Sequence, residues 1–204
     1  MENNDYVVRV GSLLTGAEIV RQRDKGNIVI TPFNPEHLNP NSFNLTLNPK
    51  MKVYTKFPLD PKDKDPEMKT VIIPEEGLVL QPGELYIACI NEWTETYNLI
   101  PMLNGRSSVG RVGLFVHVTA GFGDIGYQGN WTLELTAVVP VIVYPNMKIC
   151  QIYYHTPYGE IKETYKGKYQ GLKEAQGSLF SQDYDVADSA GVPTSIELEE
   201  INRF

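Results

Sequence analysis

Features that mark several common classes of protein are scarce in this sequence of 204 residues. It has only two cysteines, Cys89 and Cys150, in unlike contexts. That number does not make a disulfide scaffold and favours a reducing compartment, so we expect a cytoplasmic protein with two small buried thiols. No run of about 18 apolar residues occurs, which excludes an obvious membrane-spanning helix. The polar, acidic N-terminal residues do not resemble a signal peptide.

Positive charge is also scarce. The chain has 18 lysines and arginines against 25 aspartates and glutamates, giving a formal net charge of −7. A general nucleic-acid binder needs a basic surface, so we expect no nucleic-acid partner, while a local basic pocket for a small anion stays open. The three histidines, His37, His117 and His155, have no metal-ligand spacing. The zinc deaminase pattern, the phosphate-binding P-loop and the dinucleotide-binding glycine motif are missing as well.

Short strand-like segments separated by glycine and proline make up most of the chain. One helix is predicted first, in GAEIVRQRDKG, with Ser12 or Thr15 as its N-cap, Ile19 and Val20 facing inward and Gly26 closing it. Alternating or apolar segments that read as strands follow at regular spacing. These include NIVITPF, SFNLTL, MKVYTKF, GLFVHVTAG, GNWTLELTAVVPVIVY and KICQIYYHT. The pattern predicts a β-sandwich or distorted barrel in one domain.

Two segments stand apart from this strand pattern. Residues 57–69, FPLDPKDKDPEMK, read as a proline-rich, charged loop. Residues 181–204 are acidic, and we expect a loosely held tail with a short helix. Packing of this tail on a neighbouring subunit is left open.

The stretch from Asn104 to Leu135 concentrates polar side chains between glycines. Arg106, Ser107 and Ser108 follow Gly105, and a guanidinium beside two hydroxyls can hold phosphate oxygens. An ordinary surface turn is the plainer interpretation. Arg111 precedes an apolar run and could be drawn inside, where it would need a carboxylate partner.

Glu134 and Asp124 are the acidic residues of this stretch. Strand alternation puts Leu133 on one face with its apolar neighbours, and Glu134 on the other between two threonines. Glu134 is then either a solvated outer residue or, if that face lines a cleft, a general base with Arg111 beside it. Asp124 lies in a glycine-spaced hairpin, where it either bonds its own backbone or helps to recognise a flat ring.

Residues 105–135 resemble the central motif block of dCTP deaminases, within the superfamily that they share with trimeric dUTPases. These residues read GRSSVGRVGLFVHVTAGFGDIGYQGNWTLEL. Further segments resemble the same family in order, so that the resemblance covers residues 12–180. These are LLTGAEIVRQRDKGNIVITPFNPEHLNPNSFNLTL, LQPGELYIA, PNMKICQIYY and YKGKYQ with AQGSLF.

The resemblance implies a mainly β, dUTPase-like distorted barrel or jelly roll with a short N-terminal helix, assembled as a homotrimer with active sites between subunits. The family-like domain would span residues 1–180, including a C-terminal arm, and the acidic tail residues 181–204. The implied reaction is zinc-independent deamination of dCTP. Magnesium would enter with the triphosphate and be held mainly by its oxygens. dTTP is an expected inhibitor.

The resemblance also implies roles for individual residues. Glu134 would be the catalytic base, with Arg111 beside it and Ser107 near the reacting centre. Arg106 and Ser108 would bind phosphate, Asp124 would bind the sugar, and Tyr127 would pack near the sugar. Thr132 and Leu133 would line the base, and Lys168 would bind the triphosphate. The other implied substrate-binding residues are Val109, Gly110, Thr119, Ala120 and Gln176.

Three departures from the family pattern are visible. Asn44 stands where aspartate is usual, which predicts an altered structural hydrogen bond. Gly123 replaces a branched residue before Asp124, which predicts a looser hairpin. The arm reads KYQGLKEAQG, so Gln176 is only a candidate for the family's arm glutamine.

Several functions stay open at this point. The first is a deaminase that releases dUTP and ammonia. The second is a bifunctional enzyme that also hydrolyses dUTP to dUMP and pyrophosphate. The TAGF before Asp124 favours it, because this segment resembles bifunctional members of the family more than strictly deaminating ones. A dUTPase alone is disfavoured, because an apolar residue is usual there in place of Glu134. A non-catalytic nucleotide-binding regulator and a purely structural β-trimer are the alternatives outside enzymology.

Overall fold

The computed structural model describes residues 12–116 and 120–189, and only the backbone of residues 186–189. Contacts along the chain divide it into two compact units. The first comprises the described parts of residues 1–53 and 70–176, and the second comprises residues 54–69 with the described part of residues 177–204. Among the described residues, no helix has the length and apolar character needed to cross a membrane.

The predicted N-terminal helix forms as α1 (Gly16–Asp24). Thr15, not Ser12, is its N-cap, and its hydroxyl accepts a hydrogen bond from Glu18 N at 3.3 Å. Gly26 ends it with a φ of 77°, a conformation that glycine adopts without strain. Ile19 is fully buried, whereas Val20 is only half-buried. Capping chemistry therefore predicted both ends of this helix.

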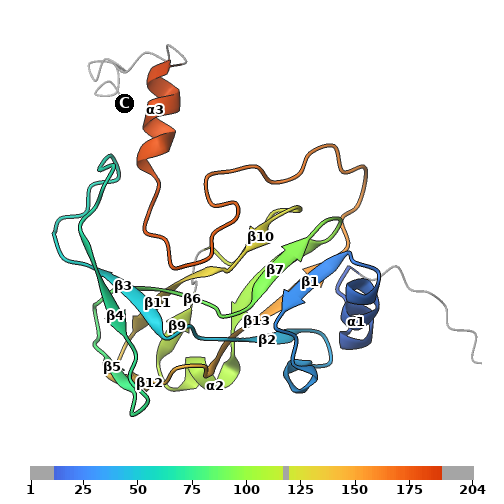
Figure 1. The fold of residues 1–204 in the computed structure, drawn as a ribbon, viewed down its shortest axis with the longest axis horizontal. Helices are drawn as coiled ribbons and strands as arrows, with labels where there is room; N and C mark the ends of the chain where they lie inside the picture. Colours follow the sequence, from blue (N-terminus) through green and yellow to red (C-terminus); the bar gives the residue numbers. More distant parts are fainter. Residues whose placement is uncertain (1–11, 117–119, 190–204) are drawn as a thin grey trace, which may run out of the picture. The chain divides into compact units, whose positions relative to one another are not determined.

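Strands make up most of the rest, and Figure 1 shows their course. They are β1 (Ile28–Thr31), β2 (Phe43–Thr46), β3 (Lys50–Tyr54), β4 (Met68–Ile72), β5 (Leu78–Leu80), β6 (Tyr86–Cys89), β7 (Trp93–Thr96), β8 (Ile100–Gly105), β9 (Leu114–Val116), β10 (Gln128–Gly129), β11 (Thr132–Ala137), β12 (Val141–Val143) and β13 (Lys148–His155). Short helices occur at η1 (Pro35–His37), α2 (Ser107–Arg111) and α3 (Ser181–Ser189). The mainly β fold with a short N-terminal helix is confirmed.

The strands pair in small sheets. The largest has the order β4-β3-β6-β11-β9, and two others have the orders β1-β7-β10 and β2-β13-β8. In Figure 1, β7 lies between β1 and β10. Along the chain, α2 connects β8 to β9. β12 pairs with β5 in a two-stranded sheet. Because β11 lies inside the largest sheet, paired with β6 and β9, its position is fixed from both sides.

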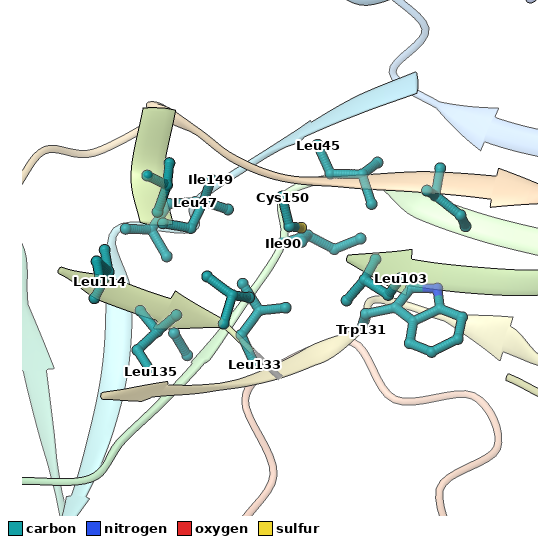
Figure 2. Packing of buried hydrophobic residues seen from close by; sticks show 14 of the residues in the cluster. Leu45, Leu47, Ile90, Leu103, Leu114, Trp131, Leu133, Leu135, Ile149 and Cys150 are labelled. Carbon is teal, nitrogen blue, oxygen red and sulfur yellow. The ribbon is translucent and has the colours of Figure 1, made fainter. Parts of the chain in front are cut away.

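The core of the first unit lies between β11 and the strands β2 and β13. Leu133 and Leu135 of β11 are fully buried, and Figure 2 shows them in one cluster with Leu47, Ile149 and Cys150. Burying one such leucine contributes about 1.5–3 kcal/mol to folding. Both cysteines are free and buried, as the sequence predicted. β2 departs from its alternating pattern, because all four of its residues are buried.

A buried polar network joins β2 to the start of β7. Glu92, which is 3% exposed, accepts hydrogen bonds from Thr46 N at 2.9 Å and from Thr46 Oγ1 at 2.8 Å. Asn91 donates to Thr46 Oγ1 and to Asn146 Oδ1. Burial raises the pKa of the Glu92 carboxyl above its usual value, and the two bonds from Thr46 oppose that rise.

In the second unit, the charged loop and the acidic segment contact each other. Lys64 Nζ lies 2.7 Å from Asp185 Oδ1, and Lys62 Nζ lies 5.0 Å from the Tyr184 ring centroid. Tyr184 also meets Phe180 edge to face. The helix α3 forms within the predicted acidic tail, of which residues 190–204 lie outside the described part of the chain. The predicted domain boundary at residue 180 stays a prediction.

Candidate functional site

The segment with the two serines and two arginines folds as α2, directly after β8. Val109 is 4% exposed and anchors the helix, while Ser107, Ser108, Gly110 and Arg111 are exposed. The expectation that Arg111 could be drawn inside is therefore wrong for a single chain. Burial of Val109 turns the rest of the short helix outward, so its polar side chains are presented to a ligand or to another molecule.

Arg106 precedes α2 and is held against β13. Its Nη1 donates to Lys148 O at 3.0 Å, and the side chain is half-buried. A guanidinium has several N–H donors, so this bond orients the group without using its full capacity for an anion. The chemistry proposed for Arg106 from the sequence, phosphate binding, is compatible with this arrangement.

Glu134 lies in the middle of β11 on the face predicted by strand alternation. Thr132, Glu134 and Thr136 are half-buried, and they alternate with buried Leu133 and Leu135. Across the ladder, Glu134 is opposite Ile87, and Thr132 is opposite Cys89. Both of these β6 residues are buried, with exposed fractions of 4% and 1%. The face that carries Glu134 is therefore not an ordinary solvated surface.

The segment that ends at Gln176 covers part of this face. Gln176 N donates to Thr132 Oγ1 at 3.3 Å, and Ala175 is 4% exposed. Burial raises the pKa of the Cys89 thiol to about 11, against an opposing hydrogen bond from the Ala175 backbone. The Gln176 backbone thus meets the strand two residues from Glu134, while the role of Gln176 stays a prediction.

Residues 121–129, the predicted hairpin before β11 and here called the hairpin, carry Asp124 and Tyr127. Asp124 is exposed, and its carbonyl accepts from Tyr127 N at 3.2 Å to close a turn. The Tyr127 ring packs 4.9 Å from Trp131 and 5.9 Å from Tyr165, measured between centroids. Burial raises the pKa of the Tyr127 hydroxyl well above its usual range. Ala120 is exposed just before the hairpin, whereas His117 and Thr119 lie outside the described residues.

Gly123 does not loosen this hairpin, contrary to the expectation from the sequence. Its N–H donates to Pro101 O at 3.0 Å, and it is buried. A Cβ at this position would come within 2.3 Å of the Trp131 ring and 2.8 Å of Pro101 O. The glycine is needed because the hairpin packs closely on β8 and on the tryptophan.

Residues 164–176, here called the arm, run beside the hairpin. Backbone hydrogen bonds join Tyr165 N to Ile125 O at 2.7 Å, Gly171 N to Gln128 O at 2.8 Å, and Asn130 N to Leu172 O at 2.8 Å. Lys168 is half-buried within the arm. Asp124, Tyr127, Lys168 and Gln176 therefore belong to one connected part of the structure, the hairpin with its arm.

The α2 residues lie apart from Glu134 along the ladder of β9 and β11. Val138 N donates to Gly113 O, so α2 joins β9 beside the far end of β11. Val138 lies four residues beyond Glu134, which corresponds to roughly 13 Å along a strand, and Arg111 comes two residues before Gly113. The ladder thus places the α2 residues and Glu134 at separate positions in one chain.

Sequence reasoning gave no role to Gln170 or Tyr165, which link arm and hairpin. Their positions in the polar, glycine-rich segment carry no periodic signal, because what makes them important is contact with residues about 40 positions earlier. Only the known path of the arm could have identified them.

Comparisons with known proteins agree on the family. Residues 13–156 match the family model described as dCTP deaminase-like. A protein from Leptospira biflexa serovar Patoc named "dCTP deaminase, dUMP-forming" is 52% identical over 173 residues, covering 85% of this chain and 98% of the relative. One of the same name from Clostridium beijerinckii is 51% identical, covering 85% of this chain and 99% of the relative.

A solved structure of similar fold is the 2′-deoxycytidine 5′-triphosphate deaminase from Agrobacterium tumefaciens, with a TM-score of 0.58 and 20% identity. The match covers 73% of this chain and 49% of that one, so the chain spans about half the length of that protein. The likeness concerns the fold. The match to the family model over residues 13–156 and to relatives at about half identity shows that the chain belongs to the dCTP deaminase family.

Proposed function

We propose that this chain is a bifunctional enzyme that deaminates dCTP and then hydrolyses the dUTP to dUMP and pyrophosphate. The observation that carries the proposal is the match to relatives named dUMP-forming, at 52% and 51% identity over nearly their whole length. The first interpretation of the sequence is a deaminase that releases dUTP. The names of the relatives favour the second, bifunctional interpretation, as does the resemblance of TAGF, before Asp124, to bifunctional members.

The proposed deamination uses Glu134 as the general base. Its carboxylate takes a proton from water as the water oxygen attacks C4 of cytosine, the electron pair of the C4–N3 double bond moves to N3, and Glu134 passes that proton to N3. Glu134 then takes the remaining proton from the C4 hydroxyl and transfers it to the amine, the bond from C4 to the amine breaks, and ammonia leaves with a carbonyl formed at C4. The sum is dCTP and water giving dUTP and ammonia. Partial burial of Glu134 beside Ile87 supports this role, because limited access of bulk water strengthens its interaction with the reacting groups.

The proposed site is shared between copies of the chain in a homotrimer. One copy contributes the side chains of Glu134, Thr132, Asp124 and Tyr127 and the main chain of Leu133, whose own side chain is buried in the core. A neighbour contributes Arg106 and the α2 side chains. Arg111 and Ser107 then lie by the reacting centre, while Arg106 and Ser108 bind phosphate oxygens. The separation of α2 from Glu134 along the β9–β11 ladder supports this division.

Lys168 of the arm is proposed as a further triphosphate contact. Magnesium enters bound to the triphosphate and screens its charge. The phosphate oxygens are its natural ligands, because magnesium prefers oxygen and binds through substrate phosphates. We further propose inhibition by dTTP and a cytoplasmic location.

Hydrolysis of dUTP requires a second water, which attacks the α-phosphorus and displaces pyrophosphate. We propose that Asp124, exposed on the hairpin, orients this water. Because attack at phosphorus depends mainly on position and charge, an aspartate at the sugar end of the site is suitably placed to act.

The test is one time course of the purified protein with dCTP and magnesium, resolving dCTP, dUTP, dUMP, pyrophosphate and ammonia. We expect ammonia, dUMP and pyrophosphate to rise together with little free dUTP. Accumulating dUTP without pyrophosphate would reject the second activity. If dCTP stays unchanged, dUTP added to the same sample separates a dUTPase from a non-catalytic binder.

The Glu134→Gln variant tests the base. The amide cannot accept the proton, so deamination should fall by at least about a thousandfold, while the melting temperature and dCTP binding stay close to those of the wild type. Turnover at the wild-type rate would remove Glu134 from the mechanism.

A further inference from the structure

We infer that Gln170 is a positioning residue, whose side chain clamps the arm to the hairpin that carries Asp124 and Tyr127. The inference rests on the proposed function for its kinetic consequence, but the clamp itself can be tested without any turnover. It extends the proposed site to a residue that acts through the hairpin and the arm.

The Gln170 amide makes three hydrogen bonds to main-chain groups. Its Oε1 accepts from Gln128 N at 2.9 Å. Its Nε2 donates to Gly126 O at 2.8 Å and to Tyr165 O at 3.2 Å. One side chain thereby joins two positions of the hairpin, one in its turn and one just after it, to the arm.

The three bonds require an amide at this position. A carboxylate could accept from Gln128 N but would face the carbonyl oxygens of Gly126 and Tyr165 with no proton to donate. A lysine could donate to those carbonyls but could not accept. The combination of one acceptor and two donors therefore favours glutamine over residues of similar length.

The turn of the hairpin and the arm pack closely against each other. Gly126 has a φ of 90°, and a Cβ there would come within 2.6 Å of Thr164 Cβ. Tyr165 meets the ring of Tyr127 at 5.9 Å. The close approach and the ring contact occur on the same turn that Gln170 binds, so arm and hairpin form one packed structure.

The clamp connects two kinds of proposed substrate contact. Asp124 and Tyr127 flank Gly126 in the hairpin, and Lys168 lies two residues before Gln170 in the arm. Loss of the side-chain bonds would leave the backbone bonds at Ile125, Gln128 and Asn130 in place. The arm would therefore loosen without unfolding the sheet. Substrate binding would then have to order the arm, which makes the free energy of binding less favourable.

The experiment compares Gln170→Leu, which removes all three bonds, with Gln170→Glu, which keeps the acceptor. The control is Gln81→Leu, an exposed glutamine in the turn before β6. Trypsin cleavage after Lys166, Lys168 and Lys173 is followed by mass spectrometry without nucleotide. Melting temperature and steady-state kinetics with dCTP are measured on the same samples.

We expect both Gln170 variants to be cleaved in the arm about tenfold faster than the wild type and Gln81→Leu, with melting temperatures close to those of the wild type. Their KM for dCTP should rise roughly tenfold, equivalent to about 1.4 kcal/mol, while kcat falls less than about threefold. Such a split indicates lost positioning of the substrate rather than general loss of folded enzyme.

Arm cleavage at the wild-type rate in Gln170→Leu would overturn the clamp. Faster cleavage throughout the chain with a lowered melting temperature would also overturn it, since Gln170 would then be an ordinary stabilising residue. Faster arm cleavage with unchanged KM would overturn its positioning role. If the wild type does not deaminate dCTP, the proposed function fails, and the arm cleavage still decides whether the clamp exists.

Discussion

At the scale of single residues, Asn44 shows how a departure from a family pattern can be accommodated. The side chain is 5% exposed, and its Nδ2 donates to His37 O and to Asn39 Oδ1, both at 3.1 Å. An aspartate has no proton to donate in these directions at neutral pH. The altered hydrogen bond predicted from the sequence is therefore a pair of amide donations, and the surroundings are built for asparagine.

Asn44→Asp should destabilise the protein by about 1–3 kcal/mol, because it would leave a buried carboxylate facing a carbonyl oxygen. Urea unfolding at neutral pH measures the change in free energy. Asn48→Asp is the matched control, because Asn48 Oδ1 accepts a hydrogen bond from Lys50 N at 2.9 Å, and a carboxylate oxygen can accept the same bond. Equal stability of the two variants would mean that the amide donations of Asn44 contribute nothing.

At the scale of elements, local chemistry predicted those that depend on near neighbours. Thr15 and Gly26 gave the ends of α1, and alternation gave the inner and outer faces of β11. The sequence could not show α2 as a helix, because a single buried side chain, Val109, anchors it. It also could not show the course of the arm, which is set by contacts such as Tyr165 N to Ile125 O. The same limit applies to the site. The resemblance identified its candidate residues, but only the strand ladders show that the α2 residues and Glu134 lie apart in one chain.

The junction between β2 and β7 should respond to pH through Glu92. Burial raises the pKa of this carboxyl in the folded protein above its usual 4.5. The folded state therefore holds the proton more tightly than the unfolded state. Its contribution to stability is complete below about pH 4.5 and is lost as the pH rises through the higher folded value.

Glu92→Gln removes this titration. From about pH 4 to about pH 7, the wild type should lose stability relative to the variant, by an amount that grows with pH. Urea unfolding at several pH values measures the difference, and Glu75→Gln, at an exposed loop carboxylate, corrects for the loss of one negative charge. A difference between wild type and Glu92→Gln that is constant across the range would contradict the raised pKa.

At the scale of the whole molecule, charge and assembly bear on the proposed substrate. The net charge of −7 disfavours general attraction of polyanions, so binding of a triphosphate must depend on a local set of cations. Arg106 directly precedes α2, Arg111 is the last residue of α2, and Lys168 lies in the arm, which is a separate part of the chain. A trimer that brings α2 of one copy to the hairpin and arm of another would concentrate these charges at each site.

Mixing two inactive variants tests this shared site. Arg106→Ala removes a phosphate contact on one side of the proposed interface, and Glu134→Gln removes the base on the other. In trimers reassembled from equal amounts of both, about a quarter of the sites would combine an intact Glu134 with an intact Arg106 from the neighbour. We therefore expect roughly a quarter of wild-type deamination after unfolding and refolding the mixture. The same variants refolded separately, then combined without exchange, are the control and should stay inactive. Failure to recover activity in a mixture shown by mass spectrometry to contain hybrid trimers would place both residues in the site of one chain.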